Sequence, residues 1–216
     1  MGPNGPEAEA SAGTGDGNGP RRAGQPDPDR SSAHPRLVGV RHIVQSEPDG
    51  FLARPDFLCG VAAIERFGLT YDVLVYERQL PDAIEFVSRF PRQSFVLDHI
   101  GKPDIKGGRI EDWRRNLRRL AEFPNVVCKL SGLVTEADWT AWTPARIRPY
   151  VETTMECFGA ERLMIGSDWP VCTLAATYRE TMALVMDAIA DWSDAERDAV
   201  LGGTAARVWR IEGSEI

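Results

Sequence analysis

Short apolar runs rich in β-branched residues recur about every 30 residues from residue 36 onward, and this recurrence constrains the fold most strongly. Between the runs lie amphipathic helical patterns that close on a glycine or stop before a proline, as helices commonly do. One strand with its covering helix takes about 30 residues, so the spacing indicates repeated βα units. The predicted strands are 37–44, 70–76, 94–100, 125–132 and 162–169.

A strict alternation of strand and helix predicts a parallel sheet, because parallel strands are joined by right-handed crossovers. Five βα units are therefore predicted, all in one α/β domain that spans residues 36–216. The helical patterns cover residues 55–68, 80–90, 111–123, 144–159, 175–192 and 194–209.

The first 35 residues differ sharply in composition from the rest of the chain. They hold seven of the 20 glycines and six of the 15 prolines, with very few large apolar side chains. Such a segment cannot bury enough apolar surface to offset the entropy of ordering it. We therefore predict a disordered Gly/Pro-rich tail over residues 1–35, ahead of the folded domain.

The net charge and the cysteine spacing limit which binding partners and which cellular compartment are expected for this protein. The net charge of -7 argues against a nucleic-acid binder, which usually presents a basic face. No apolar stretch approaches the roughly 20 residues that span a bilayer. The four cysteines are far apart, with no C-x-x-C pair, so free thiols are expected. We expect a cytoplasmic protein with neither nucleic-acid nor membrane partners.

Polar and ionisable side chains collect where the predicted strands end. The ends of parallel strands share one edge of the sheet, where ligands bind. A single such residue is often only a helix cap, but two of the chain's three histidines stand at strand ends. Asp72, near the start of its strand, is expected at the opposite end. The predicted rim consists of Arg41, His42, Gln45, Tyr76, Glu77, Asp98, His99, Lys102, Lys129, Ser131, Asp168 and Trp169.

This set of side chains suits hydrolysis of a carbonyl compound. Asp168 would take a proton from water, while His99, Arg41 or Lys102 would stabilise the oxyanion that forms. The chain lacks a G-x-S-x-G elbow, which weakens a serine-hydrolase interpretation, and lacks a phosphate loop, which weakens the alternative of an open sheet that binds a nucleotide.

Several segments resemble the amidohydrolase-related family, and within it the lactonases similar to L-fuconolactonase and 2-pyrone-4,6-dicarboxylate hydrolase. VLDHIGKP (96–103) and MIGSDWPV (164–171) are together a specific signal. The resemblance covers about residues 36–212 and includes VGVRHIVQ, VVCKLSGL and GGTAARVW. It implies an incomplete (β/α)8 TIM barrel made of the last five βα units. It also implies water attack on the carbonyl of a lactone, either a sugar lactone or a related carboxylated lactone.

The same resemblance implies roles for individual residues. His99 and Asp168 match catalytic positions, with Asp168 as the general base, and they are the candidate metal ligands if a divalent metal such as zinc is used. Two such ligands alone are fewer than the three or four that zinc sites use. The implied cofactor is therefore either none or a divalent metal. The implied substrate contacts are Arg41, His42, Lys102, Ser131 and Trp169.

The sequence departs from the family at its N-terminal side. The first-strand H-x-H pair is absent, together with about three βα units, on the order of 80 to 100 residues. Five strands leave two open sheet edges, which favour self-association. A second copy or another chain could supply the missing strands, the sheet could rearrange, or the chain could be a truncated product, which we favour. The alternative function is accordingly a catalytically inactive remnant that binds a small acid or a partner protein.

Overall fold

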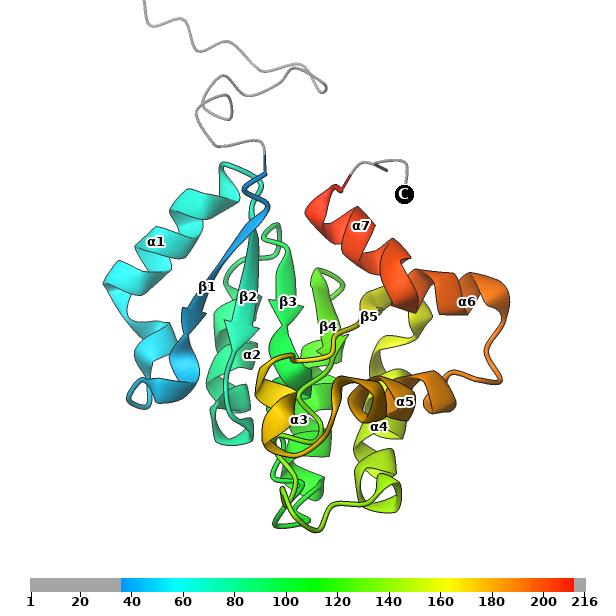
Figure 1. Ribbon diagram of the computed structural model, residues 1–216. Coiled ribbons are helices and arrows are strands. Elements are labelled where there is room, and N and C mark those ends of the chain that lie inside the picture. The colour runs from blue at the N-terminus through cyan, green and yellow to red at the C-terminus, as the bar shows by residue number, and fades with distance from the viewer. Residues whose placement is uncertain (1–35, 212–216) are drawn as a thin grey trace, which may run out of the picture. The chain divides into compact units, whose positions relative to one another are not determined.

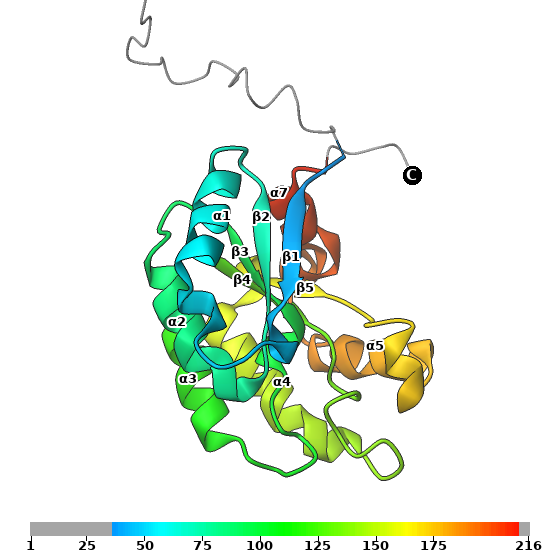
Figure 2. The same cartoon turned by 90° about the vertical axis from the view of Figure 1, so that its left-hand side faces the viewer.

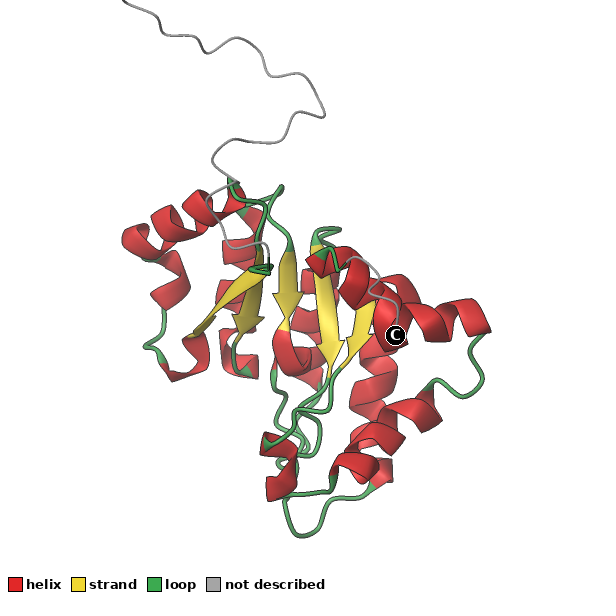
Figure 3. Ribbon diagram, turned by 45° about the horizontal axis from the view of Figure 1, so that its top comes forward, coloured by secondary structure: helices red, strands yellow, loops and turns green. Residues whose placement is uncertain are grey.

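The computed structural model describes residues 36–211, so the predicted tail at 1–35 lies outside the described residues, as do residues 212–216. Five strands form one sheet in the order β1-β2-β3-β4-β5, and each neighbouring pair is parallel (Figures 1 and 3). The predicted parallel sheet is therefore confirmed. The strands are β1 Gly39–Ile43, β2 Thr70–Leu74, β3 Phe95–Leu97, β4 Val126–Leu130 and β5 Leu163–Ile165.

Helices follow the strands at the predicted places, and local sequence explains where several of them begin. Proline in the first turn, where its missing N–H costs nothing, opens α1, α2 and α4. Thr177 and Ser193 form capping boxes with glutamates at the starts of α5 and α6. The helices are α1 Pro55–Glu65, α2 Leu80–Ser88, α3 Glu111–Ala121, α4 Pro144–Phe158, α5 Tyr178–Ala188, α6 Asp194–Asp198 and α7 Thr204–Trp209.

The single helical pattern predicted over residues 194–209 is wrong in one respect. The structure divides it into α6 and α7, joined by a wider π-type turn at Ala199–Gly203. Gly202 and Gly203 lie in this turn, where their weak helix propensity makes a break in the regular helix less costly. The break lets α7 take a course of its own across the sheet (Figure 1).

Alternating side chains give the sheet two different faces. On the outer face, Val73, Leu97 and Cys128 belong to the main hydrophobic core, together with residues of the first four helices such as Phe86, Leu117 and Ile147. On the inner face, a smaller cluster of Val96, Val127 and Met164 packs against α7 through Ala205, Val208 and Trp209. Figure 2 shows α1, α2 and α3 on one side of the sheet and α7 on the other.

Strands that neighbour one another in chain order, with helices on the outer face, form an arc of a TIM barrel. The fold is therefore the predicted incomplete barrel of five βα units, in which β1 and β5 are the edges of the described sheet. Self-association through these edges stays a prediction. All four cysteines lie among the described residues as free thiols. Within residues 36–211, none of the helices has both the length and the apolar character needed to cross a membrane.

Candidate active site

The turns after β3 and β5 bring His99 and Asp168 together. His99 Nε2 lies 3.7 Å from Asp168 Oδ1, and both side chains are largely buried, with 16% and 13% of their surface exposed. The other ring nitrogen, His99 Nδ1, lies 2.9 Å from Ser131 Oγ in the loop after β4. The sequence-based expectation that His99 and Asp168 emerge close together at one edge of the sheet is confirmed, and their catalytic role stays a prediction.

The backbone around this pair is strained. His99 and Asp168 have φ angles of 52° and 56°, in the left-handed region that non-glycine residues rarely adopt. Such residues cost about 1–3 kcal/mol each and persist only where the surrounding structure holds them. Gly132 packs so closely that a β-carbon placed on it would lie 2.6 Å from the Cβ of His99. The geometry of the pair is thus imposed by its neighbours.

A network of four charged side chains lies on the inner face of the sheet: Arg41, Asp72, Asp98 and Lys129. Asp98, which is fully buried, accepts hydrogen bonds from Arg41 at 2.9 Å and from Lys129 at 2.6 Å. Lys129 also binds Asp72 at 3.0 Å. The expectation that Asp72 lies at the opposite end of the sheet is wrong: Asp72 is the central residue of β2, in register with Arg41, and it meets Lys129 on the inner face.

Burial and pairing act in opposite directions on the pKa values of this network. Burial raises the pKa of Asp72, and nearby Asp98 adds to that rise, while Lys129 and Arg41 oppose it. Burial lowers the pKa of Lys129, but attraction to Asp98 and Asp72 outweighs this, so the net pKa is raised. The hydrogen bond from Arg41 to Asp98 likewise raises the pKa of the guanidinium. Both cations therefore stay charged and neutralise the two carboxylates.

Lys102 forms a separate ion pair beside the site. Its Nζ lies 2.7 Å from Glu136 Oε1, and both side chains are about 15% exposed. The same ammonium group sits over the ring of Tyr76, 5.1 Å from its centroid. Burial raises the pKa of Glu136 above its ordinary value, and Lys102 only partly opposes this rise. The predicted rim residue Lys102 is thus already partnered by a carboxylate.

His42 is a predicted rim residue that the structure does not bring to this cluster. Consecutive strand residues point to opposite faces, so Arg41 and His42 cannot both face inward. His42 stacks on Phe51 on the outer face, with ring centroids 4.9 Å apart, and its Nε2 lies 2.8 Å from a Glu47 oxygen. Trp169 follows Asp168 directly and is 65% exposed.

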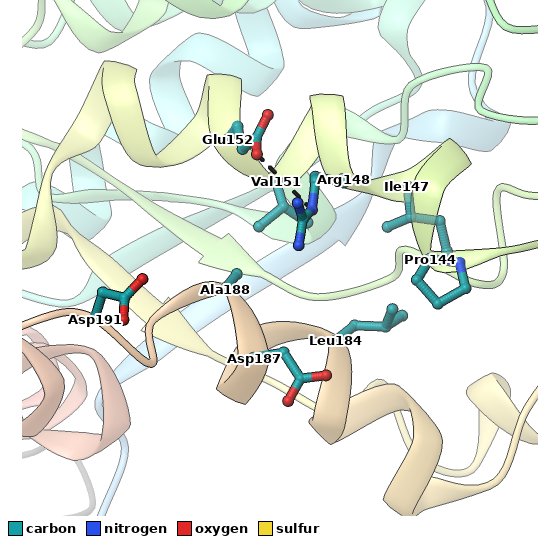
Figure 4. A pocket seen from close by; sticks show the side chains of 9 residues that line it. All are labelled: Pro144, Ile147, Arg148, Val151, Glu152, Leu184, Asp187, Ala188 and Asp191. Carbon is teal, nitrogen blue, oxygen red and sulfur yellow. Dashed lines mark ion pairs between the residues drawn. The ribbon is translucent and has the colours of Figure 1, made fainter.

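A hollow of about 260 Å³ lies elsewhere, between α4 and α5 (Figure 4). None of the predicted rim residues lines it. One side of it carries the i,i+4 pair of Arg148 and Glu152, whose charged atoms are 3.9 Å apart. Both side chains of that pair are well exposed, so we interpret this hollow as an imperfectly packed groove between two surface helices.

Burial makes His99 a neutral imidazole at neutral pH. Burial lowers its pKa, and Asp168 and Asp98 only partly oppose this effect. In metal-free buffer we expect His99 to titrate below the ordinary histidine value of about 6.5. The unfolded chain then binds this proton more readily, so the free energy of unfolding falls as the pH drops from about 6.5 towards the folded pKa.

Nuclear magnetic resonance of the imidazole carbons measures this titration directly. The chain has only three histidines, so His34→Gln and His42→Gln variants assign the His99 signals by elimination. A midpoint at or above about 6.5 would contradict the dominance of burial.

A metal ion would find only part of a site among residues 36–211. His99 Nε2 and Asp168 Oδ1 are close enough to contact one ion together, but no group of three or more His, Cys, Asp or Glu side chains surrounds them in this part of the chain. Zinc sites use three or four protein ligands. The two predicted ligands by themselves therefore do not fit a zinc site.

The site residues predicted from the sequence leave out two side chains in the loop after β4, Thr135 and Glu136. Thr135 Oγ1 lies 3.2 Å from Asp168 Oδ2, and Glu136 holds Lys102. Both follow Ser131 by four or five positions, so a search of the whole loop after each strand would have found them. Asp72 was left out because its strand was predicted to run from residue 70 to 76, whereas β2 ends at Leu74 and Asp72 is its central residue.

Comparison with known proteins identifies relatives of this chain. The amidohydrolase family model matches residues 22–211. The chain is 47% identical over 188 residues to an L-fucono-1,5-lactonase of Burkholderia multivorans, a match that covers 82% of this chain and 64% of that protein. It is 38% identical to an L-fucono-1,5-lactonase of Burkholderia ambifaria, over 82% of this chain and 63% of that protein. The chain thus spans less than two thirds of the length of these relatives.

A solved structure agrees with these sequence matches. An amidohydrolase from Burkholderia multivorans with bound zinc superposes with a TM-score of 0.81 at 45% identity, over 85% of this chain and 69% of that one. The family expected from the sequence motifs is therefore confirmed: this chain belongs to the amidohydrolase family.

Proposed function

We propose that this chain carries the hydrolytic part of a lactonase site, with Asp168 as the general base and His99 as a hydrogen-bond donor to the substrate carbonyl. The observation that carries the proposal is the 3.7 Å separation of His99 Nε2 and Asp168 Oδ1 at the carboxyl edge of a parallel sheet. The lactonase names of the two Burkholderia relatives support it and disfavour the alternative of an inactive binding domain.

The proposed reaction is hydrolytic ring opening. Asp168 Oδ1 takes a proton from water while the water oxygen attacks the carbonyl carbon of the lactone. Neutral His99 donates its N–H to the carbonyl oxygen as negative charge develops there. The ring C–O bond then breaks, and the departing alkoxide takes the proton from Asp168. The product is a hydroxy acid, and both side chains return to their starting protonation states.

The charges around the site favour a neutral sugar lactone over a carboxylated one. Each of the three cations is already paired: Arg41 with Asp98, Lys129 with Asp98 and Asp72, and Lys102 with Glu136. An anionic substrate would have to compete with these carboxylates. We retain Arg41, Lys102, Ser131 and Trp169 as predicted substrate contacts, and drop His42 because it packs on the outer face; among those retained, Arg41 exposes 45% of its side chain.

Zinc in the Burkholderia multivorans structure raises the question of a metal in this protein. We propose that a divalent ion, if bound, contacts His99 and Asp168, which would then need further ligands beyond those in residues 36–211. We also propose a cytoplasmic setting, in keeping with the four free thiols.

An assay of ring opening tests the proposal. The purified 216-residue chain is incubated with L-fucono-1,5-lactone and other sugar γ- and δ-lactones, with and without Zn²⁺ or Mn²⁺, and acid release is followed with a pH indicator. Heat-denatured protein corrects for spontaneous hydrolysis, and 2-pyrone-4,6-dicarboxylate serves as the anionic comparison. We expect faster opening of a sugar lactone than of the dicarboxylate. No acceleration of any lactone would reject the function, and a preference for the dicarboxylate would reject the substrate class.

A further inference from the structure

The loop after β4, residues 131–136, contacts three separate residues of the site. Ser131 Oγ lies 2.9 Å from His99 Nδ1, and Thr135 Oγ1 lies 3.2 Å from Asp168 Oδ2. Glu136 holds Lys102 at 2.7 Å. These three partners come from the segments after β3 and β5, so a single loop connects both sides of the site.

This β4 loop is itself firmly held. Leu133 and Val134 at its centre are fully buried. The carbonyl of Thr135 accepts a hydrogen bond from the indole N–H of Trp139 at 2.9 Å. A loop anchored by buried side chains and a backbone hydrogen bond can hold polar groups in fixed positions.

The contacts of Ser131 and Thr135 leave one atom of His99 and one atom of Asp168 facing each other. Ser131 meets the Nδ1 side of His99, which leaves Nε2 facing Asp168, and Thr135 meets Oδ2 of Asp168, which leaves Oδ1 facing His99. Thr135 Oγ1 also lies 2.9 Å from the carbonyl of Gly132, so its single hydroxyl hydrogen is shared between that carbonyl and the Asp168 carboxylate. Ser131 therefore contacts the ring nitrogen of His99 that lies away from Asp168, and Thr135 contacts the carboxylate oxygen of Asp168 that lies away from His99. His99 Nε2 and Asp168 Oδ1 are left facing each other.

We propose that the β4 loop is the positioning element of the site, with Thr135 aligning the general base Asp168 and Ser131 aligning His99. The catalytic meaning of this alignment rests on the proposed lactone hydrolysis. Thr135 and Ser131 act through Asp168 and His99, so they are positioning residues. A displacement of about 1 Å in a reacting group can lower a rate about 100-fold, which is why such contacts matter.

Three threonine variants test the role of the hydroxyl. Thr135→Val keeps the side-chain shape without the hydroxyl, Thr135→Ser keeps the hydroxyl, and Thr140→Val removes an exposed hydroxyl whose partner is Asp138. We expect Thr135→Val to lower kcat about 10- to 100-fold with little change in KM, Thr135→Ser to retain most of the activity, and Thr140→Val to behave as wild type. A Thr135→Val protein with wild-type kcat, or a Thr135→Ser protein as impaired as Thr135→Val, would overturn the proposal.

A second measurement does not depend on activity. In metal-free protein, the ¹⁵N resonance of His99 Nε2 reports the carboxylate that it faces, so Thr135→Val should shift it while Thr140→Val should not. Ser131→Ala should shift the Nδ1 resonance in the same way. If wild type opens no lactone, the proposed function fails and these shifts alone decide the positioning role. Unchanged His99 resonances in both Thr135→Val and Ser131→Ala would overturn it.

Discussion

An Asp168→Asn protein is expected to remain folded and to open a sugar lactone about 100- to 10,000-fold more slowly than wild type, the range that a general base contributes. The amide has nearly the shape of the carboxylate and can still accept the Thr135 hydroxyl, whose oxygen lies 3.2 Å from Asp168 Oδ2. It cannot take a proton from water at neutral pH. The loss should therefore fall on kcat, measured by the acid-release assay on a lactone that wild type opens.

A matched control separates the base from a general loss of charge. Asp194→Asn removes an exposed carboxylate in the first turn of α6, away from the predicted rim. It should retain wild-type kcat, and circular dichroism should give similar spectra and thermal midpoints for all three proteins. Near-normal kcat in Asp168→Asn would show that another group activates the water.

Replacing Lys129 with methionine is expected to lower the free energy of unfolding by about 3–5 kcal/mol, the usual cost of removing one partner from a buried ion pair. Lys129 binds fully buried Asp98 and also Asp72, so its loss leaves two nearby carboxylates with Arg41 as their remaining partner in the network. Methionine keeps much of the side-chain volume and can still pack beside Trp209, over whose ring the ammonium lies. Urea denaturation at pH 7 measures the loss.

Lys106→Met is the matched control for this experiment. Lys106 is 67% exposed and lies 3.5 Å from Asp138, so its removal should cost less than about 1 kcal/mol. A similarly small loss in Lys129→Met would contradict a structural role for the buried network.

The pH dependence of Lys129→Met provides a further check with a definite sign. Burial already raises the pKa of Asp72, and Lys129 is the strongest influence that lowers it. Without Lys129 that pKa rises further, so the folded variant binds a proton more readily than the unfolded chain. Its free energy of unfolding should therefore approach that of wild type as the pH falls from 7 towards 5. A deficit that grows on acidification would argue against this network as its source.

Local pattern was sufficient for much of the fold. Strands such as 126–130 are short apolar runs, and their alternation with helical segments leaves a parallel sheet as the natural solution. The positions of His99 and Asp168 followed from the same argument, since the carboxyl ends of parallel strands meet at one edge. The two-residue period of a strand already implies that Arg41 and His42 face opposite sides of the sheet, although the sequence-based prediction placed both at the rim.

The sequence by itself determined the order of elements, the direction of the strands and the edge at which His99 and Asp168 emerge, because these depend on periodicity and connectivity along the chain. Only the tertiary structure decided which atoms meet: that Lys129 reaches Asp72, that α7 covers the inner face, and that Thr135 lies against Asp168. Those contacts depend on side-chain reach and on loops packed from distant segments, which no local pattern encodes.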